Sequence, residues 1–65
     1  MRLKRISAGN YQTRDGRYYI LRLVDLRNLS QIWWILGEVV NGQCQHIDDF
    51  TSMKQARERL KELVA

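Results

Sequence analysis

The pattern of apolar and polar positions in the first two-thirds of the chain indicates antiparallel strands joined by tight turns. Two dipeptides, Asp15-Gly16 and Asn41-Gly42, tolerate the positive φ angles of tight hairpin turns. The runs beside these dipeptides are rich in β-branched and aromatic residues, which a pleated sheet favours. We expect strands over residues 6–13, 17–26, 31–40 and 43–49, with a loop at residues 27–30.

The last fifteen residues follow a helical period instead. Four apolar residues recur at spacings of three and four, so they share one side of a helix. They are Met53, Ala56, Leu60 and Leu63. Ser52 and Gln55 form a capping-box pattern that marks the helix start. No glycine or proline interrupts the segment, which therefore predicts one amphipathic C-terminal helix.

These elements predict an α+β fold, with an antiparallel sheet of three to four strands in meander order and one C-terminal helix packed on one face. The first expected strand has the weakest pattern, because Ser7, Gly9 and Asn10 interrupt its strand-favouring residues. At 65 residues, the chain is expected to form a single domain over residues 1–65. A domain of this size buries only about 60% of the surface of its unfolded chain, so it needs very efficient packing, oligomerisation or a partner.

Both faces of the two central strands are apolar. Alternate residues of a strand point to opposite faces, so the odd-numbered and even-numbered residues form two separate sets. The odd-numbered set is Tyr19, Leu21, Leu23, Trp33, Ile35 and Val39. The even-numbered set is Tyr18, Ile20, Val24, Ile32, Trp34, Leu36 and Val40, with Arg22 among them. A helix of about thirteen residues is roughly 20 Å long and covers one face only. The other face either stays wet, through strand twist and tyrosine hydroxyls, or is buried by a homodimer or a partner protein.

The second turn also predicts which residues pair across the third and fourth expected strands. A two-residue turn sets Val39 beside Cys44 and Leu36 beside Ile47. Apolar pairs would therefore persist on both faces of this hairpin.

Composition excludes several classes of protein. Hydrophobic residues make up 45% of the chain, which is unlike a disordered tail. The longest uncharged stretch, residues 28–37, is far shorter than the ~20 residues of a membrane span. The basic start leads into no apolar run, so a secretory signal is not expected. Cys44 is the only cysteine, which fits a reducing compartment.

One short segment carries residue types that bind metals. On a strand, Cys44, His46 and Asp48 project from one face, and zinc accepts all three side chains as ligands. However, a spacing of two along a single strand is not a closed-site pattern, and a fourth ligand is missing. A Cys44–His46 nucleophile–base pair would need an orienting group and an oxyanion hole. We therefore expect neither a metal, a cofactor nor an enzyme, and interpret Asp48 and Asp49 as solvated charges or partners of arginines.

Basic residues are concentrated toward the N-terminus. The net charge is +4, and residues 1–22 hold six Lys or Arg residues against one acidic residue. Such an arm and hairpin tip could contact a phosphate backbone, and a solubilising surface explains them equally well. The candidate nucleic-acid-binding residues are Arg2, Lys4, Arg5, Arg14, Arg17 and Arg22. Three tyrosines near the tip are expected to be cross-strand aromatics rather than platforms for bases.

Two motifs, on either side of a tryptophan-containing strand, carry a resemblance to known proteins. They are Gly9-x-Tyr11-x-Thr13-Arg14-Asp15-Gly16-Arg17-Tyr18-x-Ile20-x-Arg22 and Phe50-Thr51-Ser52-Met53-Lys54-Gln55-Ala56-Arg57. This pattern resembles the small accessory proteins of actinobacterial phages, mycobacteriophages in particular. The resemblance implies a phage-type module that acts in the cytoplasm of a bacterial host.

The order of three strands and a helix is also similar to the arm-type DNA-binding domain of tyrosine recombinases and to plant AP2-type domains. In those domains the sheet enters the major groove of DNA, and residues 51–56 approximate their helix start. The middle strands here carry Leu21, Leu23, Trp33 and Ile35 where a DNA-reading sheet carries polar and basic residues. Fold analogy alone does not establish function.

The leading hypothesis is a non-enzymatic binding module that acts through protein–protein contact, as a homodimer or against a host protein, by occlusion or assembly. Its anchors are the odd-numbered residues Tyr19, Leu21, Leu23, Trp33 and Ile35. The alternative is a DNA-binding accessory or regulatory protein that uses the basic arm and hairpin tip. Neither a membrane nor a small-molecule substrate is expected as a partner.

Overall fold

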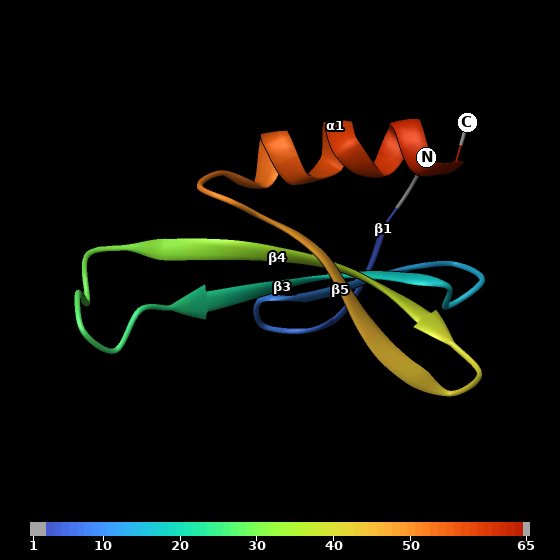
Figure 1. Ribbon diagram of the computed structural model, residues 1–65, viewed down its shortest axis with the longest axis horizontal. Coiled ribbons are helices and arrows are strands. Elements are labelled where there is room, and N and C mark those ends of the chain that lie inside the picture. The colour runs from blue at the N-terminus through green and yellow to red at the C-terminus, as the bar shows by residue number, and fades with distance from the viewer. Residues whose placement is uncertain (1–2, 65) are drawn as a thin grey trace.

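The computed structural model describes residues 3–64, in which an antiparallel sheet is followed by one helix (Figure 1). The elements are β1 (Leu3–Ser7), β2 (Asn10–Thr13), β3 (Tyr18–Val24), β4 (Ile32–Val40), β5 (Gln43–Phe50) and α1 (Met53–Val64). The strands lie in the order β1-β2-β3-β4-β5, each hydrogen-bonded to the next along the chain. The α+β class, the meander and the C-terminal helix are confirmed, and the sheet has one strand more than the expected three to four.

The extra strand arises because the N-terminal segment turns back on itself. Gly9 has a φ of 74°, and the chain reverses so that β1 pairs antiparallel with β2. The Gly9 carbonyl accepts a hydrogen bond from the Arg22 N–H at 2.7 Å, which ties this turn to β3. The expectation of a single strand over residues 6–13 is wrong, because the glycine that dilutes that strand is a turn residue.

The two predicted hairpin turns are present. Gly16 has a φ of 73°, and its N–H donates to the Thr13 carbonyl at 2.9 Å. Asn41 and Gly42 have φ angles of 52° and 77°, the two consecutive positive values of a type I′ turn.

The strand pairing beyond the second turn differs from the expected one. Val39 pairs with Cys44 as predicted, but a β-bulge follows it, and Leu36 pairs with Asp48 instead of Ile47. A bulge places two residues of one strand opposite one residue of its partner, so the register moves by one from there on.

Helix α1 covers the face of the sheet that carries the even-numbered residues of β3 and β4. Ile20, Leu36 and Leu60 are fully buried between the sheet and the helix, and Tyr18 and Ala56 complete this cluster. Ser52 caps the helix, since its Oγ accepts a hydrogen bond from the Gln55 N–H at 3.2 Å. The four residues predicted to share the inner side of the helix all belong to the core or pack against it.

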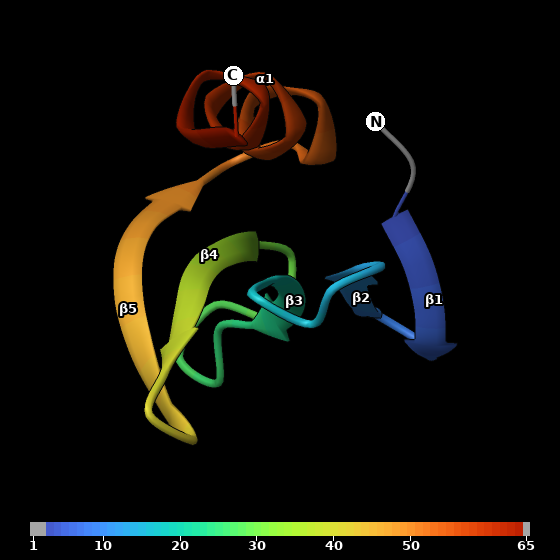
Figure 2. The same cartoon turned by 90° about the vertical axis from the view of Figure 1, so that its right-hand side faces the viewer.

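The helix lies over one side of the sheet, where it contacts β4 and β5 (Figure 2). Within residues 3–64 no helix or strand covers the other side, which we call the open face (Figure 2). The fold therefore leaves one complete sheet surface without a covering layer.

Candidate protein-interaction face

The open face gathers the five residues predicted as protein-binding anchors. Because Ile20 and Leu36 face the helix, their odd-numbered neighbours on β3 and β4 point the other way. The register then places Leu23 opposite Trp33 and Leu21 opposite Ile35. Tyr19 continues this row of pairs, opposite Gly37. The five predicted anchors are thus direct or diagonal neighbours on a single surface.

This surface is apolar and partly open to solvent. Leu23 is 55% exposed and Leu21 is 37% exposed, while Trp33 and Ile35 are half-buried by their neighbours. Leu26, in the loop between β3 and β4, is 89% exposed. Large contiguous apolar patches are uncommon on monomeric proteins and mark interaction sites.

Tyr19 differs from the other four anchors because it is already buried, with 8% of its surface exposed. Its ring lies directly over Gly37 of β4, and a Cβ at that position would overlap the ring carbons. Burial raises the pKa of the Tyr19 phenol above its ordinary value of 10.0. Tyr19 therefore forms the floor of the open face rather than a projecting contact.

Beside the Tyr19 ring the open face is hollowed. The hollow has a volume of about 200 Å³, and its lining is mainly apolar. Its lining residues are Asn10, Gln12, Tyr19, Leu21, Val39 and Cys44. The Asn10 Oδ1 atom is buried and has no hydrogen-bond partner among the described residues, which is uncommon for a buried acceptor. Sequence reasoning missed Asn10 and Gly37, because their roles depend on strands that are distant in sequence.

Charged residues on the open face nearly cancel. Lys4 pairs with Gln12, and Asp49 pairs with Ile35, which puts one cation and one carboxylate on this side. His46, opposite Gly37, contacts the Asp49 carboxylate through its Nε2 atom. The two charges lie toward the two edges of the sheet, so the apolar centre is left uncharged.

The suggested metal ligands do not share a face. Cys44 and His46 lie opposite Val39 and Gly37 on the open face, but the bulge moves Asp48 to a position opposite Leu36 on the helix side. Among residues 3–64, no group of three or more Cys, His, Asp or Glu side chains is placed to hold a metal ion. The expectation that Cys44, His46 and Asp48 project from one face is therefore wrong.

The candidate nucleic-acid-binding residues lie on different surfaces. Lys4 is on the open face, whereas Arg5 pairs with Tyr11 and Arg22 pairs with Trp34 on the helix side. Arg2 lies outside the described residues. The structure thus brings together the predicted apolar anchors but does not gather the described basic residues on one face.

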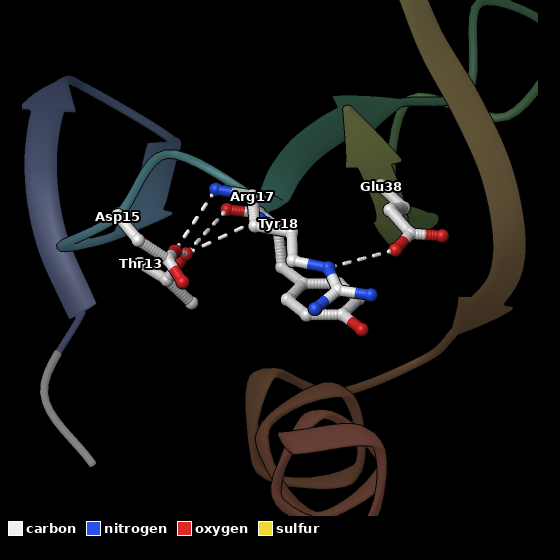
Figure 3. A network of polar contacts seen from close by, with 5 residues as sticks. All are labelled: Thr13, Asp15, Arg17, Tyr18 and Glu38. Carbon is white, nitrogen blue, oxygen red and sulfur yellow. Dashed lines mark hydrogen bonds and ion pairs between the residues drawn. The ribbon is translucent and has the colours of Figure 1, made fainter. Parts of the chain in front are cut away.

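At the hairpin tip, the two arginines differ in their surroundings, and Figure 3 shows those of Arg17. Arg14 is exposed, while Arg17 donates from Nε to the Glu38 carboxylate at 3.0 Å. This contact raises the pKa of the Arg17 guanidinium. The guanidinium also lies 5.4 Å from the centre of the Tyr18 ring. Part of the basic charge expected at this tip is consequently neutralised within the fold.

A polar clasp holds the same turn (Figure 3). The Thr13 hydroxyl donates to the Asp15 carboxylate at 2.6 Å and accepts from the Tyr18 N–H at 3.2 Å. The Arg17 N–H also donates to Asp15, at 3.0 Å. These two donors, the hydroxyl first, lower the pKa of the Asp15 carboxyl. The clasp has a structural role, since its groups satisfy one another.

Comparison with known proteins gives no match to a family model, a curated protein or a solved structure. The resemblance to phage accessory proteins therefore stays a prediction. None of the described helices is long and apolar enough to cross a membrane.

Proposed function

We propose that this protein is an interaction module whose open face binds a second copy of the chain. The observation that carries the proposal is the contiguous apolar surface formed by Leu21, Leu23, Trp33 and Ile35 on the side of the sheet opposite α1. Removing such apolar side chains from water favours association, and tryptophan is among the residue types that contribute most to the binding energy of interfaces.

The dimensions of the face suit a dimer. The molecule measures 33 × 23 × 20 Å, and α1 is stacked on the sheet along the intermediate direction (Figure 1). The open face therefore lies within an outline of 33 × 20 Å, so an interface that buries the standard ~800 Å² of accessible surface per partner needs nearly all of it. A face-to-face pair would use nearly the whole sheet.

The small core gives a second reason for association. Only three large side chains are fully buried in the described chain, namely Ile20, Leu36 and Leu60. Domains below ~70 residues rarely obtain enough stability from one such core. A dimer would form a second core between two open faces and so add the missing burial.

Electrostatics favour a second copy over a nucleic acid at this face. The whole chain has a net charge of +4, but Lys4 and Asp49 offset each other on the described open face. Two neutral apolar faces meet without charge repulsion, whereas a nucleic acid needs clustered Lys and Arg residues to displace its counterions.

The proposal is tested by size-exclusion chromatography with light scattering over a dilution series. We expect a mass of twice 7.8 kDa for the unmodified protein. Leu23→Glu should shift the equilibrium to the monomer, because it places a charge in an apolar contact of the interface. Val64→Glu is the matched control, since Val64 is 45% exposed but lies on α1, and it should remain dimeric.

A monomeric mass at millimolar concentration would overturn the proposal. The same samples, mixed with duplex DNA at low salt, then test the alternative. Retardation that weakens steeply with added salt would favour DNA binding by the basic residues. If the open face stays in contact with water and has no partner, the protein would be monomeric and would not retard DNA.

A further inference from the structure

We propose that the two copies are related by a two-fold axis that runs across the strands, so that Trp33 of each copy enters the hollow of the other. This inference rests on the proposed dimer and specifies its register. It follows from a difference between the two ends of the open face.

The open face has a raised end and a hollow end. Leu23 and Trp33 pair near the β3–β4 loop, and we call this the raised end because two large side chains meet there and Leu23 is 55% exposed. The hollow lies at the other end, where the Tyr19 ring is laid flat over Gly37 and leaves about 200 Å³ beside Val39. Trp33 and Val39 are six residues apart on β4, roughly 20 Å at the rise of a strand.

Two symmetric ways of stacking the sheets keep their strands roughly aligned. An axis along the strands places each cross-strand pair over the same pair of the other copy. With the axis between β3 and β4, Trp33 would then lie over Leu23 of the other copy, and both hollows would stay empty. An axis across the strands reverses the order of the pairs, so each raised end meets a hollow and the Leu21–Ile35 pair lies near the axis. Only this second arrangement fills the space, as a well-packed interface requires.

Two polar residues of β5, His46 and Asp49, fit the same arrangement. An axis across the strands places β5 of one copy over β5 of the other, with the order of residues reversed. His46 and Asp49 occupy successive positions on the open face, opposite Gly37 and Ile35. The reversal therefore brings His46 of each copy toward Asp49 of the other, which are groups that already attract each other within one chain. At the edge of the interface formed by β5, the histidine of each copy would then face the carboxylate of the other.

A mixing experiment with two charged variants tests this register. Trp33→Lys alters the raised end, and Cys44→Glu alters the rim of the hollow, where Cys44 is exposed and a carboxylate costs the fold little. Each variant alone should self-associate at least about tenfold more weakly than the unmodified protein, because a charge enters an apolar contact. An equimolar mixture should recover affinity, because the heterodimer keeps one native Trp33 contact and gains a Lys–Glu pair at the other. Far-ultraviolet circular dichroism of each variant confirms that it is folded.

The outcomes separate the register from the dimer itself. If the unmodified protein dimerises but the mixture shows no recovery, the axis across the strands is wrong while the proposed function stands. Recovery by a mixture of Trp33→Lys with Leu23→Glu would instead identify an axis along the strands, which lays Trp33 of one copy over Leu23 of the other. If the unmodified protein is monomeric, both the proposed function and this register fail.

Discussion

At Gly37, the backbone of β4 passes directly beneath the ring of Tyr19, a contact between adjacent strands that no local sequence rule describes. Glycine in the middle of a strand is unfavourable by itself, because it loses more backbone entropy on folding and packs nothing. Here its missing Cβ is what allows the tyrosine to lie flat. The sequence predicts which face Tyr19 occupies, but only the cross-strand partner explains why a tyrosine on the open face is buried.

The first prediction concerns this contact. Gly37→Ala should lower the free energy of unfolding by about 1–3 kcal/mol, because the new Cβ overlaps the Tyr19 ring and forces it to move. Urea denaturation monitored by circular dichroism measures the change. In a Tyr19→Ala background the same substitution should cost much less, since the ring is absent. An equal cost in both backgrounds would show that the ring contact is not the cause.

A second prediction at this scale follows from the raised pKa of the Tyr19 phenol. A pKa that is higher in the folded state than in the unfolded state stabilises the fold below the unfolded value, about 10, and this contribution is lost as the pH rises through the folded value. Stability of the unmodified protein should therefore fall more steeply above pH 10 than that of Tyr19→Phe. Denaturant unfolding at a series of alkaline pH values makes the comparison. Parallel curves for the two proteins would contradict the burial of this phenol.

At the scale of elements, the local rules succeed where a turn or a helix is determined by its own residues. The Asp15-Gly16 and Asn41-Gly42 turns and the N-terminal cap of α1 are of this kind, and the sequence predicts all three. The reversal at Gly9 is not predicted, because a single longer strand satisfies the same local preferences of residues 6–13.

The bulge in β5 depends on longer-range structure. Nothing in residues 43–50 requires an extra residue there, and the shift between His46 and Asp48 is visible only in the pairing with β4. Its consequence for the candidate chemistry is large, since it removes Asp48 from the face of Cys44 and His46. A pattern of possible ligands on one strand is therefore a hypothesis about register as much as about residue type.

At the scale of the whole molecule, one helix and one sheet form a core on one side only. The sequence predicts that both faces are apolar, but it does not determine which face receives α1, because Tyr18, Ile20 and Leu36 differ little in character from their odd-numbered neighbours. The structure assigns the even-numbered face to the helix and leaves the predicted anchors uncovered. The candidate nucleic-acid-binding residues are not gathered in this way, because those that the structure describes lie on different surfaces.

The last prediction concerns how the thermal stability of a protein with this one-sided core depends on its concentration. If the open face binds a second copy, the dimer is the stable form and its midpoint of thermal unfolding must rise with protein concentration, since mass action favours the associated state. Over a hundredfold range of concentration, the midpoint of the unmodified protein should rise measurably, while that of Leu23→Glu should stay constant and lie lower at every concentration. Val64→Glu should follow the unmodified protein, because it changes an equally accessible apolar position outside the open face. Differential scanning calorimetry measures all three under identical conditions. A midpoint independent of concentration in every sample would mean that the small core of Ile20, Leu36 and Leu60 is sufficient alone, and the open face would then need another explanation.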